Sequence, residues 1–461
     1  MNILHLDLKR SGDNYAEFRF FSNNTNDFKS RQLPLAQIEG LIKQAERDYY
    51  TVSPTDYAKT GQALYNWLDG SDRGFEQAIE HNREGIVLAI TATERLAHLP
   101  WELLHDGQKF LVERRPAIIP VRWKADRGKL TWDYQPKNRA LNVLFMASSP
   151  IDSDLPELDF EAEEGRILNA TKPIPLSLTV EESGYLNELG YLVKRYPQGH
   201  FDVFHLTGHA TNKNEKPCFI TETELGYSKY SSAEDIADAL QFKMPKLIFL
   251  SGCQTGYSWN KGIVPSMAEA LLMEGATAVL SWGKKVSDTD ATAAAATLYE
   301  NLSAGITVTE AVAKTYQELI RNKVQDWHFL RLYVAEILPG ALVTPELTED
   351  RQLVPRPSVA TEFLDSKGEV RVPKRENFIG RRRQLQNCLR SLKAPSEKIG
   401  ALIHSMGGLG KSSIASRLCD RLSEHKKIVW WRQIDESSLV NELGASQMCK
   451  FIFIRDFGLE Q

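Results

Sequence analysis

Apolar and polar residues follow the most regular pattern between residues 136 and 340. Apolar runs in this part of the chain end in small or polar residues: LNVLFMASSP (141–150), FDVFHLTGHA (201–210), PKLIFLSGCQTG (245–256) and ATAVLSWG (276–283). Stretches with the apolar spacing of helices lie between or after these runs, at residues 160–171, 184–196, 232–241, 264–275, 290–305 and 307–323. Strands that are apolar throughout are buried on both faces. The pattern therefore predicts an α/β fold with a largely parallel sheet and helices on both of its faces.

Residues 1–135 show shorter and more mixed patterns. YAEFRFF (15–21) alternates like a half-buried strand, GIVLAIT (85–91) is typical of a buried strand, and residues 35–50 have helical spacing. We expect a pair of strands within residues 110–123. Together these segments predict an N-terminal α+β region that packs on the core formed by the next part of the chain.

Trp101 and Glu102 lie in the apolar stretch HLPWELL of this region. A carboxylate in such a stretch is either a catalytic acid or a structural group that is hydrogen bonded in the interior. We favour the structural interpretation, because a buried tryptophan and a buried carboxylate both need hydrogen-bond partners.

The pattern breaks again after residue 340. Residues 341–375 are rich in proline and charge and show no period, which is typical of a linker. Residues 376–461 then contain KIGALIHSMGGLGKSSIASRLCDRL (398–422), which predicts a strand, a glycine-rich loop and a helix. We therefore expect a second, C-terminal α/β unit.

Composition narrows the classes of partner. The 461 residues are 42% hydrophobic and 25% charged, as in globular proteins, and the net charge is −4. This balance provides no basic surface for nucleic acid, and no apolar run approaches the ~20 residues of a membrane span. The five cysteines are scattered without a CxxC pair, and the N-terminus lacks the pattern of a secretory signal. We therefore expect a cytoplasmic protein with neither nucleic acid nor membrane as a partner.

Candidate chemistry lies at the ends of two predicted strands. His209 follows Gly208 in HLTGHAT, and Cys253 follows Gly252 in LSGCQTG. If these strands are adjacent in a parallel sheet, an imidazole lies beside a thiol and can take its proton or stabilise the thiolate. The backbone N–H groups of Ala210 and Cys253 are then candidates for stabilising an oxyanion. From the residues alone, a packed cysteine and a structural histidine explain the pattern as well as a catalytic pair does. We expect His205, which lies inside its strand, to be buried and structural.

These motifs resemble those of CHAT-domain peptidases, which are members of the caspase/separase group of cysteine proteases. Other segments match the family in order: LPWELLHDG, VLFMASSPIDSDLPELDFEAE, MAEALLMEGATAVLSWGKKVSDTDA and LYENLSAGITVTEAVAKTYQEL. The resemblance covers roughly residues 85–340. It implies that His209 and Cys253 form a catalytic dyad that hydrolyses peptide bonds of a protein or peptide through a thioacyl intermediate, without a cofactor or metal. The family commonly has a glutamate after the cysteine, where this chain has Gln254.

The resemblance also indicates where the substrate pocket lies. In related proteases the pocket draws on the loop after the first core strand and on the segment after the cysteine strand. Asp152 and Asp154 lie in the first segment, and Gln254 and Asp288 are candidates from the second. An acidic residue in the pocket would favour arginine or lysine at the cleaved position. Alternatively, each aspartate lies in a solvated loop or caps a helix, and Asp288 could cap a helix that starts at residue 289.

The C-terminal loop SMGGLGKSS (405–413) nearly matches the phosphate-binding pattern GxxxxGK[ST], with Ser405 in place of the first glycine. Candidate nucleotide-binding residues are Gly407, Gly408, Gly410, Lys411, Ser412 and Ser413. Lys411 would reach the β- and γ-phosphates and Ser412 would help to hold Mg²⁺. With the preceding FIGRRRQL, the loop resembles the start of NB-ARC/STAND-type NTPases. The resemblance implies ATP and Mg²⁺ as ligands, and oligomerisation through the module when it is complete.

Only 86 residues, 376–461, remain for this NTPase-like unit. We therefore expect it to be truncated, which counts against ATP binding and more strongly against ATP turnover, although Asp456 could serve as the acid at a strand end. The first interpretation of the whole chain is a peptidase gated by an NTPase module in a defence or cell-death-like pathway. The alternative is a catalytically silent, caspase-like scaffold in an NTP-dependent signalling protein.

Overall fold

The computed structural model describes most of the chain. The described residues are 1–22, 25–47, 56–80, 82, 84–124, 128–152, 165, 167, 169, 176–214, 216–253, 266–283, 286–345, 378, 380–393, 400–406, 410–422, 428–432 and 450–457.

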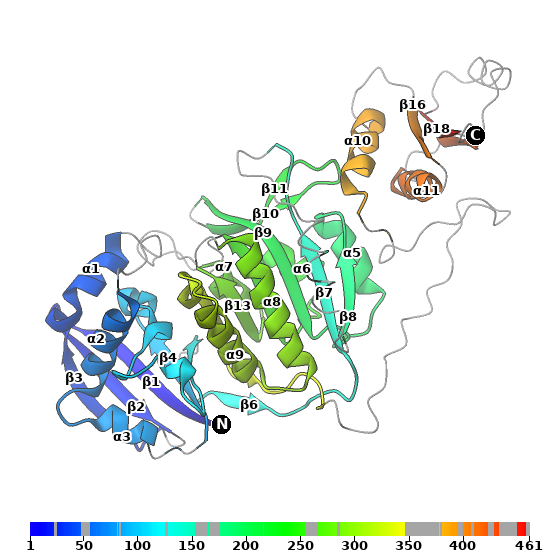
Figure 1. The fold of residues 1–461 in the computed structure, drawn as a ribbon. Coiled ribbons are helices and arrows are strands. Elements are labelled where there is room, and N and C mark those ends of the chain that lie inside the picture. The colour runs from blue at the N-terminus through cyan, green and yellow to red at the C-terminus, as the bar shows by residue number, and fades with distance from the viewer. Residues whose placement is uncertain are drawn as a thin grey trace.

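A single large sheet runs through the first two predicted regions (Figure 1). Its thirteen strands, among the described residues, are β1 (Asn2–Ser11), β2 (Tyr15–Phe21), β3 (Lys29–Pro34), β4 (Ile86–Ala92), β5 (Ile118–Trp123), β7 (Leu141–Ala147), β8 (Leu176–Glu181), β9 (Val203–Lys213), β10 (Lys216–Glu222), β11 (Ser228–Ser231), β12 (Leu247–Cys253), β13 (Ala278–Trp282) and β14 (Leu330–Val334). The strand order is β11-β10-β9-β12-β13-β14-β5-β4-β1-β2-β3, and β7 joins β8 to β9. The pairs β8–β7, β7–β9, β9–β12 and β12–β13 are all parallel, so the prediction of a largely parallel core is confirmed.

Helices cover both faces of this sheet. Helices α8 (Asp288–Ser303) and α9 (Val308–Arg321) pack on one face, and their apolar side chains share a cluster with those of β7, β12 and β13. The other face is covered by α5 (Leu186–Lys194), α6 (Ala233–Ala239) and α7 (Met267–Met273). The sheet is therefore buried on both sides, as uniformly apolar strands require.

The N-terminal region extends the same sheet. Its helices α1 (Glu39–Arg47), α2 (Tyr57–Asp69) and α3 (Gly74–Glu80) follow the first three strands, and α2 and α3 pack with β1 and β2 in a separate apolar cluster. The expected strand pair within residues 110–123 is wrong. Only β5 forms there, preceded by the 3-10 turn η4 (Leu111–Glu113), because buried Leu111 and Val112 pack into the core from a turn and not from a ladder.

The C-terminal unit forms the strand, loop and helix that the sequence predicts. Strand β16 (Gly400–Met406) precedes α11 (Lys411–Arg421), and α10 (Arg382–Lys393) packs against both. Strands β17 (Ile428–Arg432) and β18 (Lys450–Phe457) complete a parallel sheet in the order β16-β18-β17. Of the predicted linker, most residues lie outside the described part of the chain, whereas Leu342 and Val343 are buried against the core.

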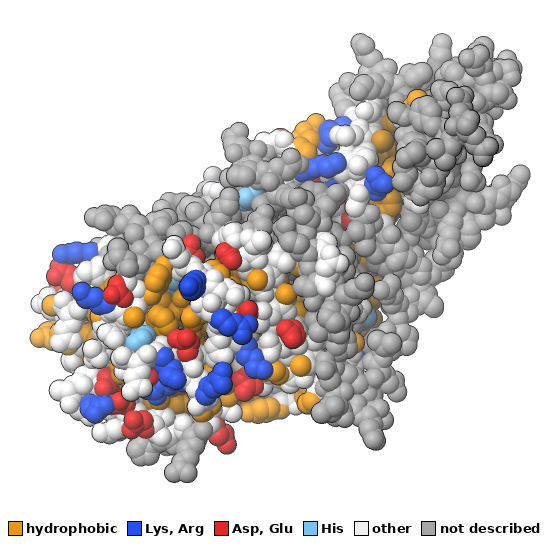
Figure 2. Space-filling view, in the orientation of Figure 1, with side chains coloured by type: hydrophobic (Ala, Val, Ile, Leu, Met, Phe, Trp, Pro, Cys, Tyr) orange, Lys and Arg blue, Asp and Glu red, His pale blue; other side chains and the backbone are white. Residues whose placement is uncertain are grey.

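The described residues show neither a membrane-spanning helix nor, on the face in Figure 2, a surface of one charge. No helix among them is both long and apolar enough to cross a membrane. On the face shown in Figure 2, basic and acidic side chains are interspersed over the N-terminal region, as the near-neutral composition would suggest.

Glu102 lies where the N-terminal strands join the core sheet. Strand β14 pairs with β5 at Tyr333↔Arg122 and Val334↔Trp123. The Glu102 carboxylate, 1% exposed, accepts hydrogen bonds from Arg122 Nε at 3.0 Å and Nη2 at 2.8 Å, and Arg331 Nε lies 3.8 Å away. Trp101 beside it is fully buried. The preference for a structural Glu102 over a catalytic acid is therefore confirmed.

Glu102→Gln should lower the free energy of unfolding by about 3–5 kcal/mol, because it leaves two buried guanidinium groups without their counter-charge. Chemical denaturation measures the change. Glu39→Gln is the matched control, since the Glu39–Lys43 pair is 59% and 68% exposed and should contribute less than about 1 kcal/mol. Equal effects of the two substitutions would contradict the assignment.

Strand β9 changes its neighbour on one edge at Gly208. Its first half, Val203 to Thr207, pairs with β7, and its second half, His209 to Lys213, pairs with β10. Gly208 has φ +157°, and a Cβ there would lie 2.6 Å from the Phe219 ring and 3.0 Å from the carbonyl oxygen of Ser148. Glycine is therefore required at the point where the two partner strands meet.

Gly208→Ala should destabilise the fold by about 1–3 kcal/mol through backbone strain, and further through the clash with Phe219. Gly275→Ala separates the two effects, because Gly275 has φ +93° but nothing within 4 Å of its Cβ position. Thermal and denaturant unfolding of both variants should show the larger loss for Gly208→Ala. A loss no larger than that of Gly275→Ala would show that the close approach of Phe219 and Ser148 is unimportant.

Candidate active site

The structure brings His209 and Cys253 together. Strands β9 and β12 are adjacent and parallel, with Gly252 paired to Gly208 and Cys253 paired to His209. Paired residues of neighbouring strands are about 4.8 Å apart. The predicted adjacency of the two strands is therefore confirmed. The side chain of Cys253 lies outside the described residues, so the dyad itself stays a hypothesis.

His209 lies at the carboxyl end of the parallel part of the sheet. It is 4% exposed and is the first residue of β9 after the change of neighbour at Gly208. On the edge away from Cys253, it lies opposite Ile220 of β10. Loops at this edge are where open α/β sheets collect their functional groups.

His205 is structural, as expected. It is fully buried, its Nδ1 lies 2.8 Å from the Tyr299 hydroxyl oxygen, and its ring stacks on Phe249 with centroids 4.6 Å apart. Burial lowers the pKa of His205 to about 3, so the imidazole stays neutral. His205 pairs with Phe249 of β12, whereas His209, further along β9, pairs with Cys253.

The oxyanion candidates lie on the same two strands. Cys253 is the last residue of β12, and Ala210 lies inside β9, opposite Phe219 of β10. The assignment of their N–H groups to an oxyanion site stays a prediction.

Two of the four substrate-pocket candidates, Asp152 and Asp288, lie among the described residues. Asp152 is exposed in the turn after β7, and its carboxylate accepts a hydrogen bond from the backbone N–H of Ser228 at 2.6 Å. Asp154 and Gln254 lie outside the described residues. Asp288 does not cap a helix that starts at residue 289. Helix α8 begins at Asp288, and Ser287 is its N-cap, whose hydroxyl accepts from the N–H of Asp290 at 3.1 Å.

The other cysteines that the structure describes are poor nucleophiles. Burial raises the pKa of the Cys218 and Cys388 thiols and raises that of Cys419 to about 12. Less thiolate forms at a raised pKa, and the thiolate is the reactive form. These cysteines therefore serve as unreactive internal references for any test of Cys253.

The glycine-rich loop of the C-terminal unit is described in part. Gly410 has φ +80° and is the N-cap of α11, Lys411 is 6% exposed, and Ser412 and Ser413 are exposed. Gly407 and Gly408 lie outside the described residues. The N-cap residue Gly410 has no side chain with which to cap α11. Binding of a phosphate at this loop stays a prediction.

Sequence reasoning missed Glu222, a fully buried carboxylate at the end of β10. It accepts a hydrogen bond from the backbone N–H of Ser149 at 2.9 Å, which joins the end of β10 to the loop after β7. The short apolar run CFI (218–220) in KPCFITE is the one local signal for this strand. The partners of Glu222 come from distant parts of the chain and leave no local pattern.

Known proteins share parts of this arrangement. The CHAT domain family matches residues 58–383. Gingipain R, an Arg-specific cysteine proteinase, is 12% identical with a TM-score of 0.37, covering 66% of this chain and 74% of its own. The Saccharomyces cerevisiae separase–securin complex is 11% identical with a TM-score of 0.39, covering 73% of this chain and 30% of the matched chain. Caspase-1 from Spodoptera frugiperda is 12% identical with a TM-score of 0.29, covering 50% of this chain and 99% of its own.

No curated protein matches the chain. The CHAT match nevertheless includes both strand ends at which His209 and Cys253 lie, together with the Glu102 segment and most of the large sheet. Because the match spans more than half of the sequence, the protein belongs to the CHAT-domain family.

Proposed function

We propose that the protein is a cysteine endopeptidase in which Cys253 and His209 form the catalytic dyad. The observation that carries this proposal is the register of β9 and β12, which pairs these two residues at the carboxyl edge of the sheet. A histidine beside a cysteine there is the arrangement that activates a thiol.

The chemistry follows from this pair. His209 takes the thiol proton, and the Cys253 sulfur attacks the carbonyl carbon of the scissile peptide bond. The negative charge on the carbonyl oxygen is stabilised by backbone N–H groups, for which Cys253 and Ala210 are the candidates. His209 then gives the proton to the leaving amine, and water hydrolyses the thioacyl bond.

Asp152 supports a preference of this site for basic residues. Its carboxylate is fixed by Ser228 in the loop that follows the first core strand. An exposed and fixed carboxylate would pair with an arginine or lysine side chain of a protein or peptide substrate. We place this activity in the cytoplasm, in line with the scattered cysteines.

We further propose that the C-terminal unit binds ATP and Mg²⁺ and gates the peptidase in a defence or cell-death-like pathway, with oligomerisation through the complete module. The succession of β16, the glycine-rich loop and α11 supports this proposal. Lys411 and Ser412 would contact the phosphates and the metal ion. Asp456 on β18 lies beside Ser405 in the ladder, at the strand end where an acid would be required.

Labelling tests the peptidase. A peptide acyloxymethyl ketone with arginine at its reactive end should modify Cys253 selectively, because the thiol pKa values of Cys218, Cys388 and Cys419 are raised by burial. His209→Ala should slow labelling at least about 100-fold by removing the base. Mass spectrometry of the labelled peptides gives the rate at each cysteine.

His200→Ala is the matched control for that experiment, since His200 lies outside the site, near Tyr196 and Phe201. It should leave the labelling rate unchanged. Slow and equal labelling of all five cysteines would instead support the silent-scaffold alternative.

Titration with a fluorescent ATP analogue tests the C-terminal unit. Lys411→Met keeps most of the volume of this buried side chain but removes its charge, so affinity should fall at least about tenfold. Lys314→Met, on the exposed side of α9, is the control. Equal affinity of Lys411→Met and the unaltered chain would refute phosphate binding at this loop.

A further inference from the structure

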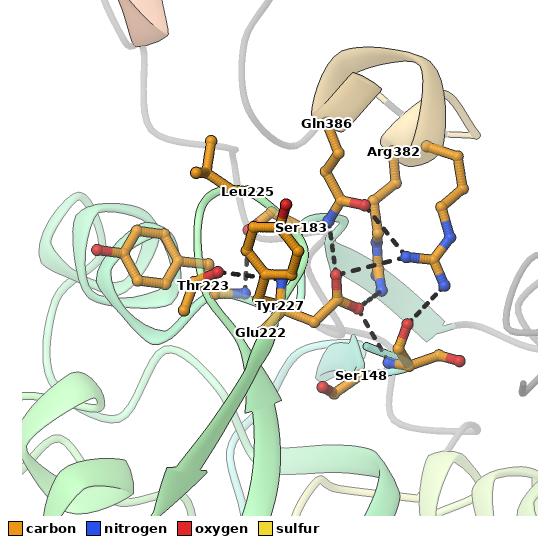
Figure 3. Close-up of polar contacts among 12 residues, drawn as sticks. Ser148, Ser183, Glu222, Thr223, Leu225, Tyr227, Arg382 and Gln386 are labelled. Atoms are coloured by element: carbon orange, nitrogen blue, oxygen red, sulfur yellow. Dashed lines mark hydrogen bonds and ion pairs between the residues drawn. The ribbon is translucent and has the colours of Figure 1, made fainter. Parts of the chain in front are cut away.

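Helix α10 is attached to the rim of the candidate active site by a buried ionic cluster (Figure 3). Glu222 is fully buried, and its carboxylate accepts from Arg382 Nη1 at 2.9 Å and from Gln386 Nε2 at 2.5 Å. The same carboxylate accepts from the N–H of Ser149 in the loop after β7. The buried Glu222 carboxylate is therefore bound both by two side chains of α10 and by the backbone of Ser149.

Further contacts join α10 to backbone carbonyl groups of the rim. Arg383 Nη2 donates to the carbonyl oxygen of Ser149 at 2.5 Å, and Arg390 Nη1 donates to that of Leu225 at 2.6 Å. Arg382 Nε also donates to the carbonyl oxygen of Glu182. Three arginines of one helix face thus fix three separate segments of the catalytic domain.

The fixed segments lead to Asp152. The N–H of Ile151 donates to the carbonyl oxygen of Gly226 at 3.0 Å, and the N–H of Ser228 donates to Asp152. Gly226 itself is tightly packed, because a Cβ there would lie 2.7 Å from Gln386 Oε1. The position of the pocket candidate Asp152 therefore depends on the turn that α10 holds.

The same segments lead to His209. The Ser148 hydroxyl donates to the carbonyl oxygen of Ile220 at 2.9 Å, and Ile220 is the residue paired with His209. Ser148 and Ser149 are consecutive, so the group that α10 holds is next to the group that supports β10.

Helix α10 is also part of the C-terminal unit. Leu385, Leu389 and Leu392 of α10 form one apolar cluster with Ile414 and Leu418 of α11, which Leu225 of the catalytic domain joins. Helix α11 makes its own contact through Arg417, whose Nη2 lies 2.6 Å from Glu188 Oε2 on α5. A change at the first turn of α11, where a phosphate would bind, can therefore move α10.

The interface is incompletely compensated. Both oxygens of buried Glu182 and two nitrogens of Arg421 have no hydrogen-bond partner among the described residues. Unsatisfied buried polar groups oppose association, and they would regain hydration if the two parts separated. The interface therefore combines strong ion pairs with buried polar groups that lack partners in the described part of the chain, and such an interface can open at a moderate cost in free energy.

We propose that α10 is a brace that positions the rim segments 148–152 and 222–228 for peptide binding and connects them to the glycine-rich loop. The inference rests on the proposed peptidase function of the same site. Release of α10 would loosen the segment that carries Asp152 while leaving Cys253 and His209 on their strands. Peptide binding should weaken, and the intrinsic reactivity of the thiol should not.

Two variants of the full chain release the brace to different degrees. Arg382→Met removes the nearer of the two guanidinium groups that face Glu222, since Arg383 Nη1 remains 3.8 Å from its carboxylate. Arg383→Met removes the bond to Ser149 from a side chain that is 21% exposed, which makes unfolding less of a risk. Arg321→Met on α9 is the matched control, since Arg321 is 73% exposed and paired only within its helix. Hydrogen exchange of residues 148–152 and 222–228 reports the rim without requiring activity.

With the brace released, exchange in both rim segments should rise, and KI for the arginine acyloxymethyl ketone should rise about tenfold. The limiting rate kinact and the rate of Cys253 alkylation by iodoacetamide should stay unchanged. Arg382→Lys should restore part of the affinity, because it returns the charge without the fork.

Other outcomes overturn the inference. Unchanged exchange would show that α10 does not hold the rim, and faster reaction with the peptide ketone would show that α10 obstructs the site. If the unaltered chain does not react with the ketone at all, the proposed function fails. Increased exchange would in that case still support the mechanical brace.

Discussion

The parallel pairing of β9 with β12 is the constraint on which the candidate site depends. Seven consecutive residue pairs, from Leu247↔Val203 to Cys253↔His209, fix the register. Both strands are apolar on both faces, so either a slip or a reversal would expose buried side chains such as Phe204 and Leu250. The packing of the sheet between two helical layers therefore determines which residue lies beside Cys253. The pairing of His209 with Cys253 at the carboxyl edge of the sheet is thus fixed by the buried residues that precede them in β9 and β12.

Gly208 marks the point at which β9 exchanges one neighbouring strand for another, next to the candidate site. Up to Thr207, β9 is an interior strand between β7 and β12, and beyond Gly208 it is held by β10 in place of β7. The two partners meet end to end, and Ser148 and Ser149 leave the sheet there. Such a junction leaves buried backbone groups that need partners. The Ser148 hydroxyl and the Glu222 carboxylate supply them, so a carboxylate is buried beside the candidate dyad for a structural reason.

The sequence predicts the core well for a physical reason. Uniform burial on both faces produces long apolar runs, which a single sequence displays directly, and each of the four runs in residues 136–340 forms a strand. The helical spacing at residues 307–323 corresponds to α9, for which Thr307 is the N-cap. The β10–β11 hairpin was missed because the apolar run in β10 is only CFI (218–220) and the four residues of β11 contain none. The partners of Glu222 were beyond reach as well, since Arg382 is 160 residues away in the chain. The site residues Asp154, Gln254, Gly407 and Gly408 lie outside the described residues, so those assignments stay predictions.

The Glu102 cluster and the α10 cluster, two of the buried ionic clusters among the described residues, differ in how they can be broken. At the Glu102 cluster, one carboxylate on the 3-10 turn Trp101–Leu103 faces two arginines on the neighbouring strands β5 and β14, so all three lie within one folded unit. At the α10 cluster, the carboxylates Glu182, Glu188 and Glu222 lie after β8, on α5 and on β10, whereas the arginines lie on α10 and α11 of the C-terminal unit. Burial raises the pKa of Glu182 to about 7, so its charge is already opposed by its surroundings. An ionic cluster within one folded unit can be broken only by unfolding of that unit. An ionic cluster divided between two units is broken when the two units separate. Of the two, only the α10 cluster can therefore act as a reversible connection.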